Sequence, residues 1–66
     1  MDRKMAELVV NEFKKKNGPQ LTILEAMTMT KIMSNGYKIY ALQKGDVTFL
    51  VWKREDGSII TKIQCW

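Results

Sequence analysis

The fold is decided by residues 37–66, which read YKIYALQKGDVTFLVWKREDGSIITKIQCW. Three runs within this stretch are rich in β-branched and aromatic residues, a composition typical of strands. These runs cover residues 37–43, 47–54 and 58–66. Gly45 and Gly57, each beside an aspartate, separate the runs at places where a chain can reverse its direction. The sequence therefore predicts three antiparallel strands joined by short turns.

The turn at Asp56 and Gly57 determines which strand side chains share a face of the sheet. If these two residues form a two-residue hairpin turn, residue 52 lies opposite residue 61, and every second residue points to the same side. One face then carries Leu50, Trp52, Ile59, Ile63 and Cys65. The opposite face carries Val47, Phe49, Val51, Ile60 and Trp66, interleaved with Lys53, Lys62 and Gln64. Both faces are therefore expected to be apolar, and the first is the expected seat of a helix.

The spacing of apolar residues predicts an amphipathic helix over residues 2–16. Apolar residues recur there at intervals of three and four, which places them along one side of a helix. They are Met5, Ala6, Leu8, Val9, Val10 and Phe13. Three lysines at 14–16 suit the negative end of the helix dipole, and Gly18 followed by Pro19 predicts a left-handed cap. Because a helix this short is marginal in water, its apolar side is expected to pack on the sheet.

Residues 20–34 contain signals for two different structures. For a helix, Thr22 and Glu25 have the three-residue spacing of a capping box. Asn35-Gly36 would then be the end of that helix. This interpretation gives two helices followed by three strands.

A hairpin is the preferred interpretation of the same region. Asn-Gly is the sequence most typical of a two-residue hairpin turn, and here it would pair Ile32 with Ile39. We therefore predict a hairpin over residues 27–43. The predicted fold class is α+β, with an N-terminal helix packed on a three- or four-stranded antiparallel meander.

A chain of 66 residues has room for a single domain, 1–66, with one small core. Domains of this size are commonly reinforced by disulfides, a metal or a partner subunit. Cys65 is the only cysteine and there is no histidine, so an internal disulfide and the usual zinc patterns are excluded. Self-association is the reinforcement that remains. A single thiol also fits a cytoplasmic protein.

No pattern in the sequence indicates catalysis or a cofactor. The absence of histidine removes the commonest general base, and with it the Ser-His-Asp and Cys-His arrangements. Glu55 and Asp56 are neighbours in a predicted turn, where solvated carboxylates point apart. Glycine-rich phosphate loops and acidic calcium loops are also missing. We predict no enzymatic activity, no catalytic residue, no cofactor and no metal site.

Apolar runs in the sequence are too short for a membrane span. The run from Phe49 to Trp52 is far below the roughly 20 residues that a spanning helix needs. Charged residues at positions 2–4 also differ from the apolar segment of a signal peptide. We therefore expect no membrane partner.

The charge distribution suggests nucleic acid as an alternative partner. The net charge is +4, and the basic excess lies within residues 31–54. Lysine and arginine neutralise backbone phosphates, while aromatic rings stack on bases. The candidate residues are Lys38, Lys53, Arg54 and Lys62, with Tyr40, Phe49 or Trp66 for stacking.

A protein partner is the preferred prediction. One helix covers only one face of a sheet, and an uncovered apolar face usually marks an interface. The candidate partner-binding residues are Phe49, Val51, Lys53, Ile60, Lys62 and Trp66. The alternative is that residues 20–34 fold across this face and bury it. We predict a non-enzymatic protein-binding or regulatory module whose partner is another protein or a second copy of the chain.

Overall fold

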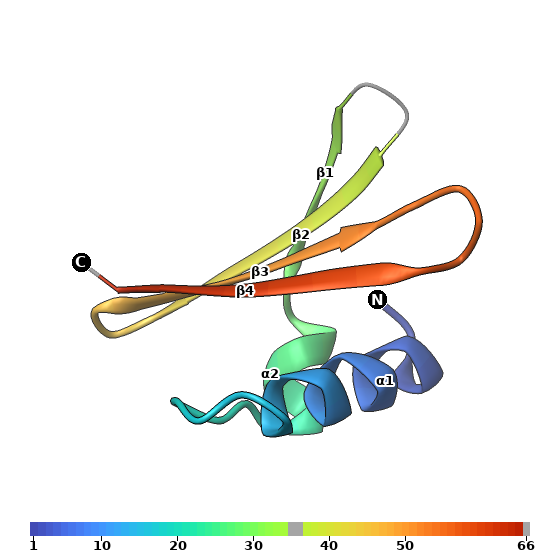
Figure 1. Ribbon diagram of the computed structural model, residues 1–66. Helices are drawn as coiled ribbons and strands as arrows, with labels where there is room; N and C mark the ends of the chain where they lie inside the picture. Colours follow the sequence, from blue (N-terminus) through green and yellow to red (C-terminus); the bar gives the residue numbers. More distant parts are fainter. Residues whose placement is uncertain (35–36, 66) are drawn as a thin grey trace.

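Two helices lie on one side of a four-stranded antiparallel sheet in the computed structural model, whose described residues are 1–34 and 37–65 (Figure 1). The helices are α1 (Arg3–Lys14) and α2 (Ile23–Met27), and neither is long and apolar enough to cross a membrane. The strands are β1 (Thr30–Ser34), β2 (Tyr37–Lys44), β3 (Val47–Lys53) and β4 (Ile59–Cys65). They follow one another in the sheet in sequence order. This arrangement confirms the predicted α+β class.

Helix α1 is capped at its start by Asp2, whose carboxylate accepts a hydrogen bond from the backbone N–H of Met5 at 2.8 Å. Its buried side consists of Ala6, Val9, Val10 and Phe13. Leu8, expected in the same stripe, is 59% exposed because it lies on the opposite side of the helix. The helix ends at Lys14, and the predicted left-handed cap at Gly18 is wrong, since the described glycines with positive φ are others.

Both signals in residues 20–34 are realised, one after the other. Thr22 Oγ1 accepts from the N–H of Glu25 at 3.1 Å, and Glu25 Oε1 accepts from the N–H of Thr22 at 2.9 Å, which forms a capping box. After five residues the chain leaves α2 and enters β1, where Ile32 pairs with Ile39 as predicted. The predicted turn at residues 35–36 lies outside the described residues.

Lys44 ties this segment to the end of β2. Its Nζ lies 3.0 Å from Glu25 Oε2 and donates a hydrogen bond to the backbone carbonyl of Gln20 at 3.3 Å. A five-residue helix is not stable by itself, so α2 depends on such contacts and on packing against α1, with Ala26 fully buried.

The loop between β3 and β4 is one residue longer than the predicted two-residue turn. The N–H of Gly57 donates to the carbonyl of Arg54 at 3.1 Å, and the N–H of Arg54 donates to the carbonyl of Ser58 at 2.9 Å. Gly57 has a φ of 91°, in the region that favours glycine. These features are typical of a three-residue loop that ends in a left-handed glycine. Residue 52 therefore lies opposite residue 60, one position away from the predicted pairing.

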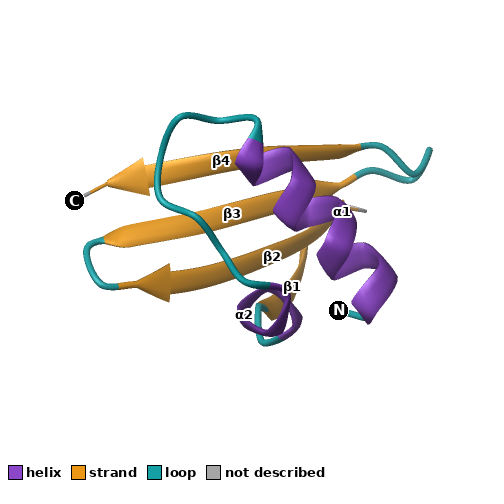
Figure 2. Ribbon diagram, turned by 90° about the horizontal axis from the view of Figure 1, so that it is seen from below, coloured by secondary structure: helices purple, strands orange, loops and turns teal. Residues whose placement is uncertain are grey.

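This one-residue shift moves the side chains of β3 to the opposite face relative to those of β4, so Phe49 shares a face with Ile63 instead of Ile60. Phe49 and Val51, expected on the uncovered face, have no solvent exposure and lie beneath the helices. Leu50 and Trp52, expected beneath the helix, lie on the opposite face. Figure 2 shows both helices and the loop that joins them on the same side of the sheet. Leu21, Ala26 and Met29 belong to the same core as Phe49 and Val51, so residues 20–34 do help to bury these two residues, as the alternative predicted. The face that carries Leu50 and Trp52 is not covered by this segment.

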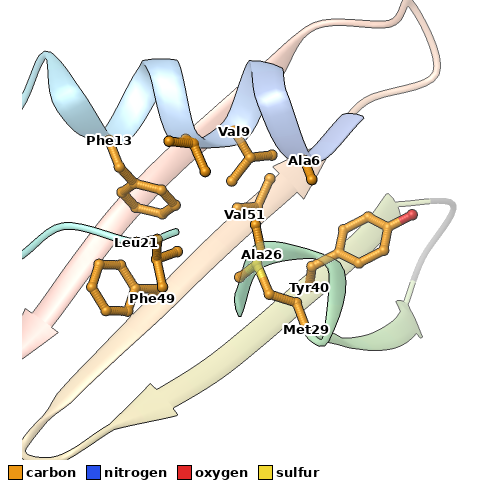
Figure 3. Packing of buried hydrophobic residues seen from close by; sticks show 10 residues of the cluster. Ala6, Val9, Phe13, Leu21, Ala26, Met29, Tyr40, Phe49 and Val51 are labelled. Carbon is orange, nitrogen blue, oxygen red and sulfur yellow. The ribbon is translucent and has the colours of Figure 1, made fainter. Parts of the chain in front are cut away.

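The core lies between the two helices and the sheet (Figure 3). Phe13 of α1 and Phe49 of β3 meet edge to face, with ring centroids 5.1 Å apart and ring planes at 88°. The other buried members are Ala6, Val9, Val10, Leu21, Ala26, Met29, Tyr40 and Val51. The core is therefore built on one side of the sheet.

Candidate functional site: the open face of the sheet

The face of the sheet turned away from the helices is the candidate site, and we call it the open face. Strand side chains alternate between the two faces, so the pairing register assigns each described position to one of them. The positions of the open face whose side chains the structure describes are Thr30, Ile32, Ile39, Ala41, Gln43, Thr48, Leu50, Trp52, Ile60, Lys62 and Gln64. In Figure 1 both helices lie below the sheet, and no described element lies above it.

A row of large apolar side chains crosses the open face from edge to edge. Ile32 of β1 lies opposite Ile39 of β2, which lies opposite Trp52 of β3, which lies opposite Ile60 of β4. We call these four residues the apolar row. Adjacent strands are about 4.8 Å apart, so the row spans roughly 14 Å.

The apolar row is accessible to solvent. Its outer members Ile32 and Ile60 are 50% and 43% exposed. Ile39 and Trp52, between them, are partly buried, as expected for side chains flanked on both sides by neighbouring strands. The row is therefore a contiguous surface, in contrast to Leu8 on α1 and Leu24 on α2, which are exposed on separate helices.

Polarity on the open face changes along the strands. Beside the apolar row, Ala41 and Leu50 continue the apolar surface, with Thr30 and Lys62 at its edges. The next row, toward the turn at Gly45, consists of Gln43, Thr48 and Gln64. Lys62 is the one charged side chain among the described strand positions of this face. The open face therefore has an apolar half, with Lys62 at its edge, and a polar row without charged side chains.

The structure brings together only part of the predicted partner-binding set. Ile60 and Lys62 are neighbours on β4 on the open face, whereas Lys53 lies on the helix side of β3. Phe49 and Val51 belong to the core, so the prediction that they form an open surface is wrong. Trp66 lies outside the described residues.

The residues missing from the predicted set are Ile32, Ile39, Leu50 and Trp52. One signal could have found the last two. Glu55-Asp56-Gly57 also fits a three-residue loop with glycine last, which shifts the pairing by one residue and places Leu50 and Trp52 on the face of Ile60 and Lys62.

The residues of the predicted nucleic-acid site are separated in the same way. Lys38, Lys53 and Arg54 lie together, with Glu55, around a cavity of about 320 Å³, while Lys62 is on the opposite face. Phe49 and Tyr40, the described stacking candidates, are 0% and 7% exposed. Buried rings are not available for stacking on bases, so this cluster offers charge without the aromatic contacts.

Two carboxylates have a lowered pKa, and both accept hydrogen bonds from the backbone. The backbone N–H of Thr22 and the ammonium group of Lys44 lower the pKa of Glu25. The hydroxyl and backbone N–H of Ser58 lower the pKa of Asp56, with a smaller attraction from Arg54. Both groups are therefore ionised at neutral pH in structural roles. Within residues 1–34 and 37–65, His, Cys, Asp and Glu form no group of three or more that could hold a metal ion.

Comparisons of the chain with protein-family models, with curated proteins and with solved structures give no match.

Proposed function

We propose that the chain is a non-enzymatic protein-binding module that associates with a second copy of itself through the open face. One observation supports this proposal above the others. The apolar row Ile32, Ile39, Trp52 and Ile60 crosses all four strands on the face that no described element covers. Apolar surface of this kind usually marks an interface, because its burial releases water.

The chemistry of the open face favours a second copy as the partner. An isologous dimer places the same patch against itself, so the patch must be neutral enough to avoid repulsion. Apart from Lys62, the described strand positions of this face are uncharged, and Lys62 lies outside the apolar row. Two sheets packed face to face, about 10 Å apart, allow one row to meet its copy. Trp52, between Ile39 and Ile60, is the residue type most enriched at interface centres.

The size of the open face predicts a weak dimer. Four strands about 4.8 Å apart, each roughly seven residues long at about 3.3 Å per residue, give a footprint of roughly 400 Å² per copy. The pair then buries about 800 Å² or somewhat more, near the lower limit of specific interfaces at about 1,000 Å². We therefore expect a dissociation constant of roughly tens to hundreds of micromolar.

Sedimentation equilibrium from about 10 μM to about 1 mM tests this proposal. The wild-type chain is expected to shift from monomer to dimer across this range. Ile60→Lys and Ile32→Lys place a charge in the row at positions that are already exposed, and each is expected to raise the dissociation constant at least about tenfold.

Leu8→Lys is the matched control, because Leu8 is 59% exposed but lies on the outer side of α1. Its dissociation constant is expected to stay within about twofold of the wild-type value. A wild-type chain that remains monomeric up to the highest concentration would refute self-association. Equal effects of Leu8→Lys and Ile60→Lys would refute the assignment to the open face.

A further inference from the structure

A basic cluster lies at the end of the sheet that carries the β3–β4 loop, and it is distinct from the open face. Lys38 of β2 lies directly opposite Lys53 of β3, on the helix side of the sheet, and Arg54 follows Lys53 in the chain. Both lysines are partly buried. Together with Glu55, these three cations line the cavity of about 320 Å³.

The protein itself compensates only part of the charge of this cluster, through Glu55 in the lining and a weaker attraction between Arg54 and Asp56. Like charges directly opposite each other in a sheet repel. The ion pairs in the described part of the chain are Arg3–Glu7, Lys15–Glu12 and Lys44–Glu25, so none of them involves the cluster. Asp56, the nearest other carboxylate in the loop, accepts hydrogen bonds from the N–H and hydroxyl of Ser58 at 2.9 and 2.6 Å. A bound anion is therefore the group that would relieve the repulsion.

We propose that this cavity binds a phosphate monoester dianion. Three cations and the carboxylate of Glu55 give the cavity lining a formal charge of +2 at neutral pH, as three minus one. A phosphate monoester carries about −1.5 to −2, which matches that charge, whereas a carboxylate or a phosphodiester carries only −1. Arg54 offers the planar donor fork that suits phosphate oxygens, and the lysines act as point charges.

The cavity suits a phosphate group attached to a larger ligand. Its volume lies near the lower end of small-molecule sites, about 300 to 1,000 Å³. The hairpin loop beside it has a defined backbone, because Arg54 and Ser58 are joined by a hydrogen bond of 2.9 Å and Gly57 closes the turn onto Arg54 at 3.1 Å. The site is therefore held in place by the same loop that fixes the strand register.

Titration of the full chain with a blocked phosphoserine, acetylated and amidated so that phosphate is its only charge, tests the proposal. Amide NMR shifts at low salt report where it binds. We expect shifts centred on Lys38 and residues 53–55. Affinity is expected to rise severalfold between pH 5 and pH 7.5, since the second phosphate pKa is about 6. Sulfate is a dianion throughout this pH range, so its affinity is expected to change little between pH 5 and pH 7.5.

Lys38→Gln, Lys53→Gln and Arg54→Gln are each expected to weaken phosphoserine binding about two- to fivefold. Lys14→Gln and Lys16→Gln each remove one exposed positive charge at or just after the end of α1 and are the controls for net charge, with no expected change. Circular dichroism of each variant separates loss of binding from loss of fold. A parallel titration with inorganic phosphate shows whether the free ion binds at the same residues.

Three results would overturn the proposal. The first is equal binding of blocked glutamate and blocked phosphoserine, which would mean that any anion is accepted. The second is tighter binding of an oligonucleotide without terminal phosphate, which would assign the cluster to a nucleic-acid backbone. The third is a loss of affinity in the Lys14 and Lys16 controls as large as that in the cluster variants.

Discussion

Lys38 and Lys53 illustrate how much a single pairing position decides at the residue scale. In the sequence they are two members of a diffuse basic excess over residues 31–54. In the sheet they are direct cross-strand neighbours on one face. The repulsion between the two ammonium groups opposes folding, whereas their closeness in space favours the binding of an anion. The same two side chains therefore affect stability and the proposed binding with opposite signs.

Replacing Lys53 with threonine is expected to stabilise the fold. The change removes the repulsion with Lys38 and introduces a residue that suits strands, so the free energy of unfolding should rise by about 0.2–1 kcal/mol. Lys62→Thr is the control, because Lys62 lies opposite Leu50 rather than another lysine. Urea denaturation at low salt measures both variants. Equal changes in the two would show that the Lys38–Lys53 pair contributes no repulsion of its own.

At the scale of elements, the β3–β4 loop determines which side chains of β3 and β4 share a face of the sheet. With three residues from Glu55 to Gly57, it pairs β3 and β4 so that Phe49 lies opposite Ile63 and Val51 lies opposite Thr61, on the face that the helices cover. A two-residue turn would instead have placed Phe49 and Val51 on the same face as Ile60 and Lys62. Gly57, at a φ of 91°, is the residue that makes the longer loop possible without strain.

Gly57→Ala is expected to lower the free energy of unfolding by about 1 kcal/mol or more, because a side chain is strained at positive φ. Gly18→Ala is the matched control. Its φ is not positive, and a Cβ there would lie 3.5 Å from Ile63 Cδ1, an ordinary contact. That variant should be unchanged or up to about 1 kcal/mol more stable, since alanine restricts the unfolded chain. Chemical denaturation of both variants checks the difference, and an equal loss in both would contradict it.

At the scale of the whole molecule, both helices and the loop between them share one side of the sheet (Figure 2). One of the contacts that hold the helices on the sheet is made by a carboxylate. Glu25 is part of the capping box of α2 and also forms an ion pair with Lys44 at the end of β2. Asp56 has the corresponding role in the β3–β4 loop through Ser58. The stability of the layered structure is therefore linked to the ionisation of these two groups.

The fold is expected to lose stability in acid. The pKa of Glu25 and that of Asp56 are lower in the folded chain than their ordinary values of 4.5 and 3.8. Folding therefore favours the ionised forms, so their contribution is complete above the ordinary values and is lost as pH falls through the lowered ones. Thermal melts across the acidic range measure this loss. Glu25→Gln should show a shallower decline below pH 4.5, and a decline as steep as that of the wild-type chain would contradict the role of Glu25.

Only two residues of the open face, Ile60 and Lys62, were predicted as partner-binding from the sequence. The α+β class and the single amphipathic helix were predictable, because the spacing of Val9 and Phe13 and the strand composition are local patterns. The capping box and the Ile32–Ile39 pair were both visible as well, although they were treated as alternatives. They proved compatible because α2 is only five residues long.

The sequence by itself determined α1, the strands and the presence of apolar side chains on both sides of the sheet, since each depends on neighbours within a few residues. It gave α2 only as an alternative to the hairpin. Only the tertiary structure decided which side chains of β3 the helices cover, because β3 has apolar residues on both faces and its alternation alone does not distinguish them. It also decided that Lys38, Lys53 and Arg54 meet at one cavity while Ile32, Ile39, Trp52 and Ile60 form one row. Both groupings join residues that are distant in the chain, and a shift of one position between two strands would separate them.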